Sequence, residues 1–343
     1  MGVGVAVAFV VIATVAAGCV TDRDGSEPQR TCDDAVPVDV DEVSVVATVA
    51  PITNIVSVIA AGSDVRVEGV VPEGVDSHTY EPTTSVAVAL EQADVVFLNG
   101  LELEARTKEL AVANSDGSVV CELGDHVLPE SEYIFDFSFP ESAGSPNPHL
   151  WTNPLMAADY ATVVRDVLSA VAPDDADVFE SNHDEFVARI DTLDRAVRVA
   201  SDTLAPEDRL LLTYHDAYAY FAGEYGWTVV GAVQPASFDE PTPREVAQLV
   251  EQIRERGVAV IFGSEVFPSP VLRQIASETG VTYVDELRDD DLPGRPGDPE
   301  HSWFGLMTFN LVTIVEALGG DAEAIATIDT SPSAPDAAVY PQE

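Results

Sequence analysis

The stretch from Asp174 to Leu204, DDADVFESNHDEFVARIDTLDRAVRVASDTL, is the part of the sequence that decides the fold. Its apolar positions step by three and four residues, with charged residues between them: Phe186, Ile190, Leu193, Val197, Ala200 and Leu204. This period predicts one amphipathic helix, about 45 Å long at 1.5 Å per residue. No glycine or proline interrupts the stretch before Pro206. A helix of this length can run along two lobes and join them.

Strand-like and helix-like segments alternate on both sides of this stretch. Strands are expected at 43–49, 65–71, 95–98, 210–214, 228–233, 258–262 and 281–284, and helices at 53–61, 84–92, 155–172, 217–225, 243–256, 270–279 and 303–318. Such alternation is typical of βαβ units and parallel sheets. The predicted fold class is therefore α/β, with two lobes of mostly parallel sheet (43–173 and 206–325) joined by one long backbone helix (174–205).

The two ends of the chain have a different composition. Gly2 to Gly18 is an apolar run that stops at small residues before Cys19, after which the sequence becomes polar. A run this short predicts a secretory signal rather than a membrane-spanning helix, and Cys19 resembles a lipoprotein processing site. We expect residues 1–19 to be a signal peptide with lipid attached at Cys19, 20–42 a tether and 326–343 a disordered tail. A cysteine that merely follows a signal or an anchor is the alternative.

Charge excludes one class of partner. The chain has 16 Lys and Arg against 60 Asp and Glu, a formal net charge of −44. Phosphate binding requires clustered basic residues, so nucleic acid is not an expected ligand. We expect a monomer.

Two cysteines remain if Cys19 carries lipid. In an exported, oxidising setting a disulfide between Cys32 and Cys121 is possible, although the sequence alone does not show that they meet. Neither belongs to a CxxC pair, so a thiolate metal site is not expected.

The candidate metal ligands are His78, His149, His215 and Asp285, which lie in four segments far apart in the chain. Three imidazoles and one carboxylate form a complete shell for an ion such as Zn²⁺. His215 and Asp285 follow predicted strands, where open α/β sheets bind ligands. Each histidine could instead be structural, and Asp285 could cap a helix. The residues alone leave these alternatives open.

Five motifs resemble one protein family: HTYEPT at 78–83, ADVVFLNGLELE at 93–104, NPHLWTNP at 147–154, HDAYAYF at 215–221 and LMTFN at 306–310. They resemble the zinc/manganese solute-binding proteins of ABC importers, which have the TroA-like fold. The resemblance implies His78, His149, His215 and Asp285 as metal ligands. It also implies metal delivery to a membrane permease by a protein that is lipid-anchored to the outer face of the cytoplasmic membrane.

The donor set favours Zn²⁺, with Mn²⁺ as the alternative. Four protein ligands leave no position for a catalytic water, which favours a carrier over an enzyme. The other hypotheses are an exported zinc-dependent hydrolase, with Asp285 as general base, and a cell-surface adhesion protein on the same fold. The acidic segment 124–147 contains only one histidine, His126, and is expected to be a plain surface loop.

Overall fold

The computed structural model describes residues 1, 29–72, 74–114, 117–234, 241–264 and 269–331. Most of the expected signal peptide, including Cys19, lies outside these residues, as do the first part of the tether and most of the tail. Among the described residues, no helix is both long enough and apolar enough to cross a membrane.

The N-terminal lobe is built on a four-stranded parallel sheet in the order β2-β1-β3-β4. Its strands are β1 (Val43–Ala47), β2 (Val65–Gly69), β3 (Val95–Leu98) and β4 (Val119–Glu122). Its helices are α1 (Ala50–Ala60), α2 (Thr84–Gln92), α3 (Ala105–Asn114), α4 (Leu123–Val127) and α5 (Pro154–Val171). Every residue of β1 and β3 is buried, as expected for parallel strands covered on both faces.

The C-terminal lobe repeats this arrangement with a parallel sheet in the order β6-β5-β7-β8. Its strands are β5 (Leu210–Thr213), β6 (Thr228–Ala232), β7 (Val260–Ser264) and β8 (Thr282–Leu287). Its helices are α7 (Ala219–Tyr225), α8 (Pro243–Arg256), α9 (Pro270–Thr279), α10 (Trp303–Ala317) and α11 (Glu323–Ala326). Gly257 and Gly280 end α8 and α9 with φ of 69° and 79°, a conformation that costs glycine little.

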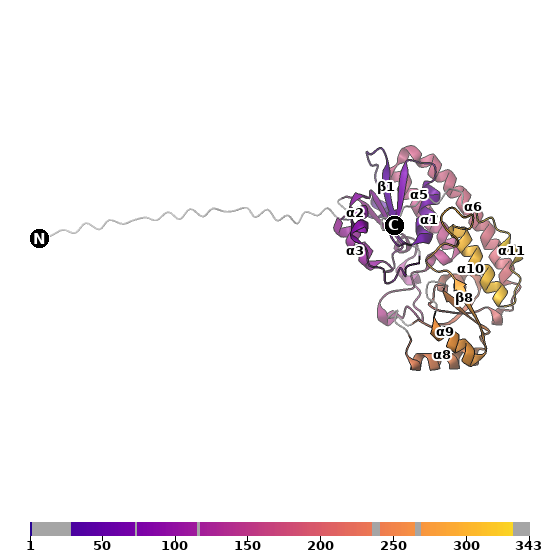
Figure 1. The fold of residues 1–343 in the computed structure, drawn as a ribbon. Coiled ribbons are helices and arrows are strands. Elements are labelled where there is room, and N and C mark those ends of the chain that lie inside the picture. The colour runs from indigo at the N-terminus through magenta and orange to yellow at the C-terminus, as the bar shows by residue number, and fades with distance from the viewer. Residues whose placement is uncertain (2–28, 73, 115–116, 235–240, 265–268, 332–343) are drawn as a thin grey trace.

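The long helix α6 (Ala176–Ser201) joins the lobes. It contacts α1 and α5 of the first lobe and α7, α10 and α11 of the second, and Figure 1 shows it along one side of the molecule. The predicted fold class is confirmed. The helix is shorter than the predicted stretch at its start because Pro173–Asp175 forms a separate 3₁₀ turn.

Two tryptophans connect the lobes through the core. The indole N–H of Trp303 donates to the carbonyl of Trp151 at 3.1 Å, and that of Trp151 donates to the carbonyl of Asp289 at 3.1 Å. Both tryptophans are fully buried. The backbone N–H of Trp303 also donates to Asn54 of α1 at 2.9 Å. These bonds fix the chain segments around the lobe interface relative to one another.

Part of the segment expected as a tether is attached to the N-terminal lobe. Cys32 and Cys121 are joined by a disulfide. The carbonyl of Arg30 accepts from the N–H of Val120 at 2.9 Å, and the N–H of Val38 donates to Val171 at 3.0 Å. Edge strand β4 has backbone groups free to pair with an incoming segment. The prediction of a free tether is therefore wrong for residues 29–38.

Residues 326–331, the first part of the expected tail, are attached to the helix α6. The guanidinium of Arg189 on α6 donates to the carbonyls of Asp329 at 2.7 Å and Ser331 at 3.0 Å. The prediction of a disordered tail therefore does not hold for this part.

Candidate metal centre

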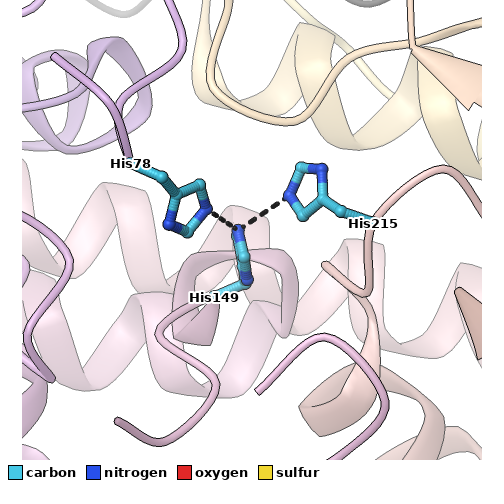
Figure 2. A group of neighbouring side chains, drawn as sticks. All are labelled: His78, His149 and His215. Atoms are coloured by element: carbon cyan, nitrogen blue, oxygen red, sulfur yellow. Dashed lines mark hydrogen bonds between the residues drawn. The ribbon is translucent and has the colours of Figure 1, made fainter. Parts of the chain in front are cut away.

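Three imidazoles meet where the two lobes face each other (Figure 2). The Nε2 atom of His149 lies 3.2 Å from Nε2 of His78 and 3.1 Å from Nε2 of His215. Zn–N bonds of about 2.0–2.1 Å in tetrahedral geometry would place ligand nitrogens roughly 3.3–3.4 Å apart. The spacing of the three rings therefore fits three ligands of one small cation.

His149 is held in one tautomer by its neighbour Asn147. The Asn147 amide nitrogen donates to two acceptors, the Asp136 carboxylate and the Asp216 carbonyl, each at 2.7 Å. Its amide oxygen must then be the atom that faces His149, where it accepts the backbone N–H at 3.0 Å and contacts Nδ1 at 2.9 Å. An oxygen cannot donate, so Nδ1 of His149 carries the proton. The Nε2 lone pair is left for a metal ion.

His215 lies just beyond the end of β5. Thr213 holds the turn by donating its hydroxyl to the His215 carbonyl at 2.7 Å. The Asp289 carboxylate lies 3.5 Å from Nδ1 of His215, on the opposite side of the ring from the cluster. A carboxylate behind a ligand imidazole is the usual arrangement around protein-bound metal ions.

His78 is carried by a loop that the C-terminal lobe holds in place. The Asp290 carboxylate accepts from the N–H and the hydroxyl of Ser77, at 3.2 and 2.6 Å. The Asp291 carboxylate accepts from the N–H of Gly74, with both oxygens at 2.9 Å. Residues 289–291 therefore connect the second lobe to the loop that presents His78.

Burial keeps the imidazoles neutral. Desolvation lowers the pKa of His78 and His149 well below 6.5, and the positive field of neighbouring imidazoles lowers each further. Burial also lowers the pKa of His215, while the nearby carboxylates of Asp290, Asp76 and Asp136 oppose that shift. At neutral pH the rings are unprotonated, which is the form that binds metal.

The fourth predicted ligand, Asp285, does not join this group. Among the described residues, only the three histidines form a set of ligand atoms within 4.8 Å of one another. Asp285 lies within β8 with its side chain exposed, because the strand continues to Leu287. The pairing with β7 shifts by one residue there, since Phe262 pairs with Val284 but Ser264 pairs with Leu287.

Asp289 and Asp290 are the acids that the sequence reasoning missed at this site. Both are buried, and burial raises the pKa of each to about 7. One oxygen of Asp290, Oδ1, is buried without a hydrogen-bond partner among the described residues. The sequence feature that could have identified them is a run of three acids, Asp289-Asp290-Asp291, shortly after a predicted strand. Glu265, another acid that follows a predicted strand, lies outside the described residues.

Two other histidines are structural. His183 on α6 is buried, with Nε2 3.0 Å from the Thr162 hydroxyl. His301 is buried beside the Pro293 carbonyl, with Nδ1 3.2 Å away. Neither lies in the cluster.

A buried glutamate supports the loop beside His78. Glu104 accepts the backbone N–H groups of Asn99 at 2.8 Å and Gly100 at 3.2 Å, and the Thr48 hydroxyl also donates to it. These bonds close a turn in which Leu101 and Glu102 have φ of 52° and 64°, unusual for residues other than glycine. Burial raises the pKa of Glu104 to about 7.

A family model that matches most of the chain shows which family the chain belongs to. The model of the family described as zinc-uptake complex component A, periplasmic (ZnuA), matches residues 45–317. The chain belongs to this family. Its members are the metal-binding, substrate-binding components of zinc and manganese ABC importers, and their role is to deliver metal to a permease.

Named relatives match between 76% and 90% of the chain. It is 27% identical to the manganese-binding lipoprotein MntA of Halalkalibacterium halodurans, over 90% of this chain and 96% of that protein. It is 28% identical to the iron-binding protein YfeA of Yersinia pestis, over 76% of this chain and 81% of that protein. The solved structure of the periplasmic zinc-binding protein TroA from Treponema pallidum matches with a TM-score of 0.73 and 28% identity, over 81% of this chain and 99% of that one.

Glu104 predicts a pH dependence of stability. A carboxyl with a pKa raised from 4.5 to about 7 binds its proton more tightly in the folded state, so its stabilising effect is present below pH 4.5. That effect is lost as pH rises through 7, by up to about 3 kcal/mol. Urea unfolding of the metal-free chain between pH 5 and 8 should therefore have a flatter pH profile for Glu104→Gln than for the unaltered chain. Parallel profiles would contradict this role.

Proposed function

We propose that this chain captures Zn²⁺ outside the cytoplasm with His78, His149, His215 and one aspartate, and passes it to the permease of an ABC importer. The observation that carries the proposal is the convergence of three buried Nε2 atoms from three distant segments. Three adjacent unprotonated imidazoles are costly to bury unless a cation shares their lone pairs.

Asp290 is our candidate for the fourth ligand. Its free oxygen is buried, and its charge opposes the lowering of the His215 pKa that burial causes. A divalent ion between the imidazoles would attract this carboxylate. Asp285, which the family resemblance implied, is exposed on β8 and is the less suitable donor in this arrangement.

The donor set supports zinc over manganese. Zn²⁺ commonly takes four nitrogen and oxygen donors in a tetrahedron, whereas the harder Mn²⁺ prefers more oxygen. Relatives are named for zinc, manganese and iron, so the family alone does not choose between these ions.

A site with four protein ligands suits a carrier better than a hydrolase. Hydrolytic zinc sites keep one position open for a water molecule. Here three imidazoles and Asp290 would fill the coordination shell, and His149 and His215 are almost completely buried. We further propose that the protein works as a monomer, anchored by lipid at Cys19 to the outer face of the cytoplasmic membrane. Relatives named as lipoproteins support the anchor.

Competition among metals tests the proposed cargo. The purified chain, stripped of metal and dialysed against equal Zn²⁺, Mn²⁺ and Fe²⁺, should retain one Zn²⁺ per chain by elemental analysis. His215→Ala should lose most of this metal, while His126→Ala, at an exposed site outside the cluster, should retain it. Retention of Mn²⁺ in place of Zn²⁺ would support the proposed site but contradict zinc as the cargo. Metal unaffected by His215→Ala would contradict the site.

Two aspartate variants test the fourth ligand. Asp290→Ala should weaken Zn²⁺ binding by more than about 100-fold, because changes outside the coordination shell already cost about 10–100-fold. Asp285→Ala carries the same charge change on the same segment and should leave the Kd within about twofold. Indicator competition titration measures both. The reverse order of effects would assign the ligand to Asp285.

A further inference from the structure

The cluster is exposed to solvent on one side. His149 and His215 are 0% and 2% exposed, whereas His78 is partly exposed. Two cavities reach His78, one of about 170 Å³ and one of about 120 Å³. Each is large enough for an ion with several water molecules. An ion that reaches the cluster by either cavity meets His78 first.

The charges in the two cavities differ. Glu102 lines both cavities. The smaller one is also lined by Arg106, which pairs with Glu81, and by Glu104, whose carboxylate already accepts three hydrogen bonds. In the larger one, Glu102 is the only acidic residue among the described lining residues, and no lysine or arginine lines it. Lys108, the only lysine in the sequence, is bound to Glu122 at 2.8 Å. The larger cavity has an acidic lining residue and, among the described residues, no basic one, so it is the more favourable path for a cation.

The larger cavity also reaches toward the second ligand. It is lined by Pro148, which precedes His149, and by Phe139. The Phe139 ring centroid lies 5.5 Å from that of His78 and 5.6 Å from that of His149. Phe139 is buried and gives the cavity an apolar lining beside both rings. His78 is the member of the cluster that lines this cavity.

We propose that metal enters and leaves through the cavity lined by Glu102, Phe139 and Pro148, and that the Glu102 carboxylate receives the ion at the mouth and transfers it to His78. This inference rests on the proposed function. Glu102 is exposed and lies in the turn that Glu104 holds in an unusual backbone conformation. It is an entry residue and not a ligand of the bound ion.

A residue that acts only on the path has a specific kinetic signature. It lowers the barrier between solvent and site, so it speeds entry and exit by the same factor and leaves the equilibrium Kd unchanged. A ligand would instead change mainly the rate of release and the Kd. Measuring both rates distinguishes the two roles.

The test compares Glu102→Gln with Glu109→Gln in the purified full chain. Glu109 is exposed on α3 of the same lobe and gives the same change in net charge. Stopped-flow mixing with Zn²⁺ and a fluorescent zinc indicator gives the association rate, and excess chelator gives the dissociation rate. For Glu102→Gln we expect both rates to fall by about threefold to tenfold at low ionic strength, with Kd within twofold. Glu109→Gln should match the unaltered chain, and 0.5 M salt should reduce the difference.

Three results would overturn the inference. Equal rates for Glu102→Gln and Glu109→Gln would remove Glu102 from the path. Faster release with a higher Kd would make Glu102 a ligand. Both results leave the proposed function intact, provided that the unaltered chain binds one ion. Failure of the unaltered chain to bind metal would overturn the proposed function and this inference together.

Discussion

The close approach of three buried, unprotonated imidazoles is the constraint on which the rest of this structure depends. The Nε2 atoms of His78 and His215 lie within 3.2 Å of Nε2 of His149. In a buried site, protonating two such neighbouring rings would cause strong repulsion between them. The surrounding groups satisfy this constraint in different ways. Asn147 fixes the tautomer of His149, Asp289 lies behind His215, and Asp290 holds the loop of His78. These contacts fix the positions of the three rings relative to one another.

The two-lobed fold explains how such distant residues reach one point. His78 and His149 come from the first lobe and His215 from the second, so the cluster forms only if the lobes keep a fixed relation. The α6 helix, the Trp151 and Trp303 hydrogen bonds and the Asp290–Ser77 contact all act across this boundary. A core that continues between the lobes favours small movements over wide opening.

Much of this arrangement could be predicted from the sequence, because it follows from periodic patterns. The apolar spacing around Phe186 and Ile190 predicted the linking helix, and the alternation of strands and helices predicted two parallel sheets. The three histidines were candidates because each lies in a structured segment. The position of the fourth acid was harder to predict, since it depends on where β8 ends. A shift of one residue in its pairing and an end at Leu287 leave Asp285 exposed and bring Asp289 and Asp290 to the site. The attachment of residues 29–38 to β4 was likewise missed, because pairing with a distant edge strand leaves no local pattern.

Crystallographic location of the bound ion tests the central claim most directly. Crystals of the zinc-loaded chain, measured on both sides of the zinc absorption edge, would give an anomalous difference peak for each ordered ion. We predict one dominant peak about 2.0–2.1 Å from Nε2 of His78, His149 and His215, with an Asp290 oxygen completing the tetrahedron. A dominant peak away from these three imidazoles would contradict the account.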